Sequence, residues 1–145
     1  MKERLQKDLK AALKARQTER LATLRLLLSQ IKNEEISRGK ELVSKDVLVL
    51  VQRGIKTRRD SVEQFERGGR TDLVAREKEQ IAVLEDYLPQ QLSDQELKQA
   101  ALNIIQELKA ETKKDMGKVM KALLERHAGK VDGRQASQTV ASLLK

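Results

Sequence analysis

Residues 87–98 read YLPQQLSDQELK, and this stretch divides the chain in two. Pro89, the only proline, predicts the end of a helix, because its ring fixes φ and removes a backbone hydrogen-bond donor. Ser93 and Glu96 follow with the spacing of a capping box, in which each side chain accepts a hydrogen bond from the backbone N–H of the other residue. A helix end followed closely by a helix start predicts a boundary between two domains.

The hydrophobic pattern on both sides of this boundary predicts an all-α protein. Apolar residues recur at helical spacing, and no segment alternates with period two. Residues 1–90 are expected to form an N-terminal bundle of long helices. Residues 91–145 are expected to form a small C-terminal three-helix bundle, with helices over residues 94–110, 116–127 and 133–144.

Small polar residues and glycines mark the expected helix ends of the N-terminal bundle. A Ser or Thr side chain can accept from the free N–H groups of a first turn, and Gly adopts the left-handed conformation that ends many helices. Among the apolar residues, Leu13 and Leu48 are expected to face the core. The candidate N-caps are Thr18, Ser44 and Thr71, and the candidate stops are Gly39 and Gly68 with Gly69.

Two charged residues fall on apolar seams. Arg58 interrupts the seam of the third helix, and Glu77 interrupts that of the fourth. In an antiparallel hairpin around Gly68 and Gly69 their side chains would lie at similar heights, which predicts an inter-helix ion pair. The pair either sets the register of the two helices or belongs to an active site, and the first interpretation is favoured.

Composition excludes several classes of function. The chain has no cysteine and one histidine, so neither a thiol nucleophile nor a Cys/His metal cluster is expected, and no cofactor is predicted. Glycine-rich phosphate loops and the G-x-S-x-G motif are absent, which argues against a self-sufficient enzyme. The N-terminus carries charges without an apolar stretch, and no run approaches the length of a membrane span, so a cytoplasmic protein without a membrane partner is expected.

The net charge of +8 favours anionic partners. Basic residues of the second and third helices could form a secondary basic surface on the N-terminal bundle. The alternative, which is favoured, is an ordinary solvated face balanced by nearby acids. The basic residues concerned are Arg25, Lys32, Arg53, Lys56 and Arg59.

The C-terminal bundle has a denser group of cations, around the starts of two helices. Asp115 and Asp132 are candidate caps for these helices. Backbone N–H groups beside lysines make a phosphate site, although two capped turns with solubilising lysines explain the pattern as well. With only one Phe and one Tyr, recognition of unpaired bases by stacking is not expected. The candidate nucleic-acid-binding residues are Lys113, Lys114, Gly117, Lys118, Lys121, Lys130 and Arg134.

Four segments together resemble the YqeY family of small bacterial proteins: TLRLLLSQIKNEEI, IKTRRDSVEQFERGGRTDL, EDYLPQQLS and KKDMGKVMKALLERHAGKVDGR. The family is related to the C-terminal tail of the B subunit of tRNA-dependent amidotransferases, a helical appendage that contacts tRNA. The resemblance implies two helical parts and makes the cations of the last segment candidate tRNA contacts. The body that activates the acyl-tRNA and the amidase are both missing.

The function expected from these observations is a non-catalytic module that binds tRNA or another folded RNA. Two alternatives stay open. One is a protein-interaction module that binds an amidotransferase or an aminoacyl-tRNA synthetase. The other is a subunit that acts with glutamine-dependent aminoacyl-tRNA amidation machinery. In that case the family label, a carbon-nitrogen ligase with glutamine as amido donor, would describe the machinery as a whole.

Overall fold

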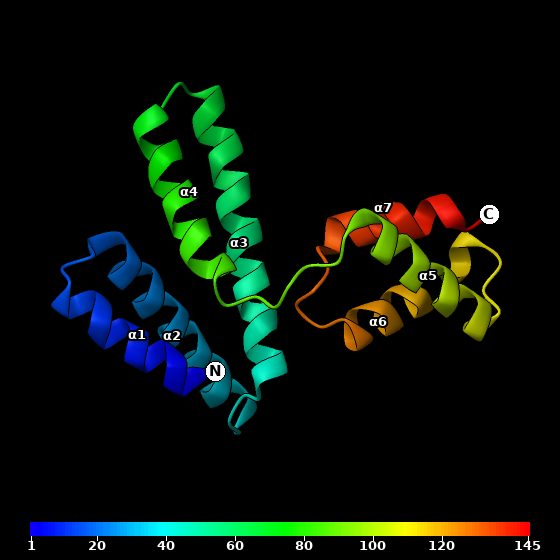
Figure 1. Ribbon diagram of the computed structural model, residues 1–145, viewed down its shortest axis with the longest axis horizontal. Coiled ribbons are helices and arrows are strands. Elements are labelled where there is room, and N and C mark those ends of the chain that lie inside the picture. The colour runs from blue at the N-terminus through cyan, green and yellow to red at the C-terminus, as the bar shows by residue number, and fades with distance from the viewer. The chain divides into compact units, whose positions relative to one another are not determined.

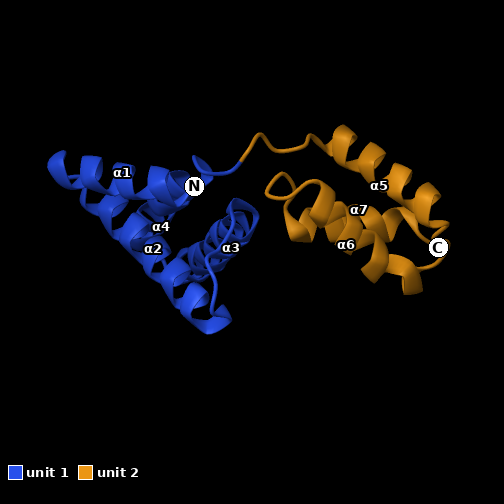
Figure 2. Cartoon of the chain, turned by 90° about the horizontal axis from the view of Figure 1, so that it is seen from below, with its two compact units in different colours: residues 1–88 blue, residues 89–145 orange.

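The computed structural model describes residues 1–145 and contains seven α-helices, one short 3-10 helix and no strand. The expectation of an all-α fold is confirmed. The chain divides into two compact units, Met1–Leu88 (unit 1) and Pro89–Lys145 (unit 2), which Figure 2 shows in different colours. Each unit has its own hydrophobic core.

Unit 1 consists of two helical hairpins. The first pairs α1 (Lys2–Lys14) with α2 (Thr18–Arg38), and the second pairs α3 (Ser44–Arg67) with α4 (Thr71–Glu85). Contacts of α2 with α3 and α4 join the hairpins (Figure 1). α2 ends at Gly39, which is left-handed at φ 69°, and α3 ends at Gly68, so both expected stops are confirmed.

The helix starts of unit 1 differ from expectation in their caps. The three predicted cap residues are each the first residue of a helix, and no side chain caps these helices. A cap residue needs a non-helical backbone for its side chain to reach the next turn, and these residues have already entered the helix. The prediction was therefore wrong for Thr18, Ser44 and Thr71.

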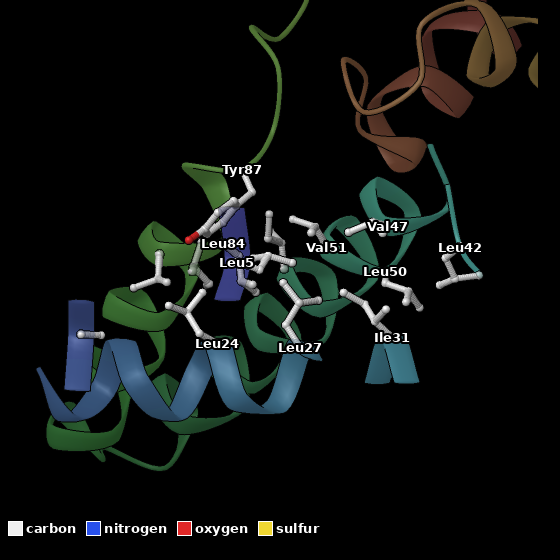
Figure 3. Close-up of a cluster of buried hydrophobic side chains, with 14 of the residues drawn as sticks. Leu5, Leu24, Leu27, Ile31, Leu42, Val47, Leu50, Val51, Leu84 and Tyr87 are labelled. Atoms are coloured by element: carbon white, nitrogen blue, oxygen red, sulfur yellow. The ribbon is translucent and has the colours of Figure 1, made fainter. Parts of the chain in front are cut away.

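The core of unit 1 is made mainly of leucine and valine side chains from all four helices. Figure 3 shows Leu24 and Leu27 of α2 pointing toward Leu5 of α1 and Leu84 of α4. Leu13 was expected in this core but is 56% exposed. It follows the buried Ala12, and one residue turns a helix by about 100°, which carries its side chain away from α2. On α3, Leu50 is fully in the core, whereas Leu48 is only half-buried.

Gly54 of α3 lies directly against Leu84 of α4. A Cβ atom at this position of α3 would lie 3.2 Å from Leu84 Cδ1 of α4. Leu84 itself is 3% exposed, so it has little room to move aside. The missing side chain at Gly54 therefore lets a buried leucine of α4 rest directly on the backbone of α3.

A polar clasp joins the first and last helices of unit 1. The Tyr87 hydroxyl, after the end of α4, donates a hydrogen bond to Asp8 Oδ2 of α1. The Arg4 guanidinium lies 4.6 Å from the centre of the Tyr87 ring, and its Nη2 donates to the Asp86 carbonyl at 3.2 Å. Burial, and then the hydrogen bond to Asp8, raise the pKa of the Tyr87 phenol well above its ordinary value of 10.0.

Unit 2 is a three-helix bundle. It contains α5 (Asp94–Leu108), the 3-10 turn η1 (Lys113–Asp115), α6 (Met116–Arg126) and α7 (Gly133–Leu143). Each α-helix packs against the other two. The capping box is confirmed: Glu96 N donates to Ser93 Oγ, and Ser93 N donates to Glu96 Oε1, both at 3.1 Å.

Substitution of Gly54 tests the contact between α3 and α4. Gly54→Val adds three carbon atoms against Leu84, and we expect a loss of about 1–3 kcal/mol in the free energy of unfolding of unit 1. Gly54→Ala is the control, because helix propensity gains about 1 kcal/mol while a single methyl group needs only a small shift of Leu84. Urea unfolding measures both. A stability of the valine variant equal to that of the alanine variant would contradict the close packing.

The capping box is tested by two matched serine substitutions. Ser93→Ala removes an acceptor for Glu96 N and should cost about 1 kcal/mol. Ser44→Ala removes a hydroxyl that caps nothing and should change stability by only a few tenths of that amount. Amide hydrogen exchange in α5 and α3 reports each effect separately, and equal protection losses in the two variants would refute the assignment.

The ionisation of Tyr87 can be followed alone, because the chain has one tyrosine and no tryptophan. The folded pKa is raised, so the stability that the neutral phenol contributes is complete below about pH 10 and is lost as the pH rises beyond it. In folded protein, tyrosinate absorbance should stay absent at about pH 10, where the urea-unfolded chain is half-ionised. Asp8→Asn should move the folded titration toward the unfolded one. Identical folded and unfolded titrations of the unsubstituted chain would rule out the buried clasp.

Candidate nucleic-acid interface

The predicted RNA-binding cations of unit 2 are exposed and have no ion-pair partners. This holds for Lys113, Lys114, Lys118, Lys121, Lys130 and Arg134. The single ion pair of unit 2 instead joins Arg126 to Glu107. Each of the six charges is therefore free to meet an anion from outside the chain without breaking an existing pair.

The start of α6 differs in detail from the prediction. Asp115 was expected to cap this helix, but its Oδ2 accepts a hydrogen bond from Glu111 N at 3.1 Å, and no side chain caps α6. A 3-10 turn precedes the helix, and it directs the carboxylate back toward the preceding loop. The backbone N–H groups at this helix start thus lie beside Lys113, Lys114 and Lys118, and no side-chain carboxylate accepts a hydrogen bond from them.

The start of α7 agrees with its prediction. Asp132 is the N-cap, and its Oδ2 accepts a hydrogen bond from Gln135 N at 3.4 Å. A carboxylate therefore already occupies the place that a phosphate would need at this helix start. Lys130 and Arg134 flank it as exposed cations.

The starts of α6 and α7 lie at opposite ends of the bundle. At one end, Leu92 N donates to the Lys130 carbonyl at 2.9 Å, close to the start of α7. At the other end, Lys145 N donates to the Glu111 carbonyl at 3.2 Å, just before η1 (Figure 1). The 11 residues of α6 between them span about 16 Å. The candidate cations therefore do not form one pocket.

Lys118 and Lys121 extend the group of cations from η1 toward the middle of α6. They are three residues apart on α6, so they project from the same side of the helix. Both are exposed. The cations consequently form an extended series from η1 along α6, rather than a single phosphate cradle; we call Lys113, Lys114, Lys118 and Lys121 the α6 strip.

The candidate basic residues of unit 1 differ in their surroundings. Arg59 is paired with Glu85 at 3.5 Å, whereas Arg25, Lys32 and Lys56 are exposed without ion-pair partners. Arg53 lines a groove between α2 and α3 to which none of the other four contributes. The five cations therefore do not line one common groove, and their joint surface stays a prediction.

Arg58 and Glu77 do meet, within a larger network. Arg58 Nη1 lies 3.4 Å from Glu77 Oε2 and also donates to the Gln80 side-chain carbonyl. The Gln80 amide donates to Glu19 Oε2 at 2.7 Å, and Arg76 Nε donates to Glu19 Oε1 at 2.7 Å. The network links α2, α3 and α4 through polar side chains.

Sequence reasoning missed the central member of this network. Glu19 accepts from both Gln80 and Arg76, and these contacts lower the pKa of its carboxyl, with Gln80 the largest cause. Glu19 lies in the first turn of α2, where an acid is favourable for any helix, so its sequence position gives no distinctive signal. Since both carboxylate oxygens already accept a hydrogen bond, the group holds helices together and offers no free base.

A groove of about 400 Å³ runs between α2 and α3, with Glu77 and Leu84 of α4 at its lining. We call it the α2–α3 groove.

The chain contains no group of three or more His, Cys, Asp or Glu side chains that could hold a metal ion. None of the helices is both long and apolar enough to cross a bilayer.

Comparison with known proteins places this architecture in a family. The model of the family described as Yqey-like protein matches residues 2–144. Over 108 residues the chain is 41% identical to "Altered inheritance of mitochondria protein 41, mitochondrial" of Lachancea thermotolerans, covering 72% of this chain and 58% of that protein. The chain thus spans little more than half of that relative.

Two other relatives extend the comparison. An uncharacterized protein of Schizosaccharomyces pombe is 33% identical over 90 residues, which are 62% of this chain and 73% of that protein. The similarly named mitochondrial protein of Pyrenophora tritici-repentis is 29% identical over 146 residues, covering 97% of this chain and 79% of that protein.

These relatives correct two predictions. The proteins of the family were expected to be bacterial, whereas these relatives are fungal. The expected cytoplasmic location is likewise contradicted, because the Lachancea and Pyrenophora proteins are named as mitochondrial. Composition and helical patterning do not distinguish one compartment inside a cell from another, so they gave no information on this location.

The match over residues 2–144 takes in both helical units, and the chain belongs to the Yqey-like protein family.

Proposed function

We propose that the chain is a non-catalytic RNA-binding protein that holds a folded RNA, of which tRNA is the best candidate, through the α6 strip of unit 2. The observation that carries the proposal is the set of exposed and unpaired cations along η1 and α6. Lysines in this state neutralise phosphates and release the counterions of the nucleic acid, which drives binding. The resemblance to the tail of amidotransferase B subunits supports tRNA as the RNA class.

The extended form of the α6 strip suits a phosphate backbone better than a single phosphate group. From Lys113 to Lys121 the strip covers a rise of about 12 Å, which is long enough to face more than one phosphate of a backbone. Gly117 leaves the α6 start open, since nothing lies within 4 Å of the place of its Cβ. Contacts of this kind fix position on the RNA without reading bases, in keeping with the near absence of aromatic residues.

The test is binding to folded bulk tRNA across a salt series, with duplex DNA for comparison. We expect Lys118→Glu with Lys121→Glu to weaken tRNA binding by at least about tenfold and to reduce the salt slope by roughly 1 to 2. Lys7→Glu with Lys10→Glu on α1 is the matched control, because both lysines are exposed and the change in net charge is the same.

Equal losses in the two double variants would mean that net charge alone governs binding, and would refute the α6 strip. Equal affinity of the unsubstituted chain for tRNA and duplex DNA would refute the recognition of a folded RNA. Unchanged binding in the Lys118 and Lys121 variant would remove the site assignment altogether.

A further inference from the structure

The floor of the α2–α3 groove in unit 1 is apolar. Leu27, Leu50 and Leu84, from three different helices, are at most 7% exposed and form its base. Leu26 lies on the wall and is 49% exposed. A half-exposed leucine beside a leucine floor is apolar surface that a partner could remove from water, which favours association.

The groove has the length of three helical turns. Its α2 wall runs from Thr23 to Glu34, and its α3 wall runs from Leu50 to Ser61. Each wall covers a rise of about 16 Å. The groove is open to solvent along its side, whereas sites for small molecules usually enclose most of the ligand. An open groove of this length matches the row of apolar side chains that one face of a helix presents.

The rim carries polar groups that are not used within the chain. Gln30 and Asn33 of α2 and Arg53 of α3 line the groove and have no side-chain partners. The two acids of the lining are both engaged, since Glu34 pairs with Arg38 at 2.9 Å and Glu77 pairs with Arg58. Arg53 is therefore the unpaired charge of the groove, and it favours an acidic residue on the partner.

We propose that the α2–α3 groove binds an acidic amphipathic helix of a partner protein. The apolar side chains of that helix lie over Leu26, Leu27 and Leu50, and a carboxylate at its edge pairs with Arg53. This site belongs to unit 1 and uses none of the lysines of the α6 strip, so it stands whether or not the chain binds RNA.

The experiment starts with a displayed library of helical peptides of about fifteen residues, selected against the full chain. We expect the selected peptides to share leucine or isoleucine at i, i+3 or i+4 and i+7, together with acidic residues. A labelled peptide from this set should shift the methyl NMR signals of Leu26, Leu27, Leu50 and Leu84. Leu26→Glu should weaken binding by more than about tenfold, and Arg53→Glu by on the order of tenfold.

Two matched variants separate the groove from general effects. Leu13→Glu changes a leucine that is similarly exposed but lies on α1, and Lys56→Glu makes the same charge change on α3 outside the groove. Neither should weaken peptide binding by more than about twofold. Methyl spectra of each variant confirm that unit 1 is folded.

Three results would overturn the proposal. The first is a library that yields no helical peptide above background. The second is equal weakening by the groove variants and their controls. The third is a shift of the groove methyl signals by folded RNA and not by any peptide, which would assign the groove to nucleic acid.

Discussion

The close approach of α3 and α4 at Gly54 is the constraint on which unit 1 depends. Leu84 rests on the backbone of α3 where any larger residue would place a Cβ atom 3.2 Å from it. The same leucine is part of the core and part of the floor of the α2–α3 groove. Helix contact, core packing and the shape of the groove therefore meet at one position, where the residue of α3 has to be small.

Charge is used differently in the two units. In unit 1 most charged side chains near the helix interfaces are engaged, as in the network of Glu19, Gln80 and Arg58, and in the clasp of Tyr87 with Asp8. In unit 2 the basic side chains are mostly unpaired and exposed. Engaged charges set helix register, whereas the free cations of unit 2 attract counterions and stay available to a partner.

Local signals in the sequence were reliable where the interaction itself is local. The capping box of Ser93 and Glu96, the stop at Gly39 and the cap at Asp132 all involve groups within a few residues of one another. The expected cap at Asp115 failed because its carboxylate accepts a hydrogen bond from Glu111 N in the preceding loop and none from the start of α6. The sequence pattern does not predict which of two nearby backbone N–H groups will donate a hydrogen bond to such a side chain.

By itself, the sequence determined the helical class, the positions of most helix ends and the facing of Arg58 toward Glu77, because 3.6-residue periodicity and capping depend on neighbours along the chain. Only the tertiary structure decided that the starts of α6 and α7 lie at opposite ends of unit 2, which separates cations that are close in sequence. It also decided that Glu19 and Gln80 complete the Arg58 network. Five basic residues of α2 and α3 were predicted to form a surface, and the tertiary structure decided that only Arg53 among them lines the groove. These facts depend on how helices pack through distant contacts, and no pattern within a single helix carries that information.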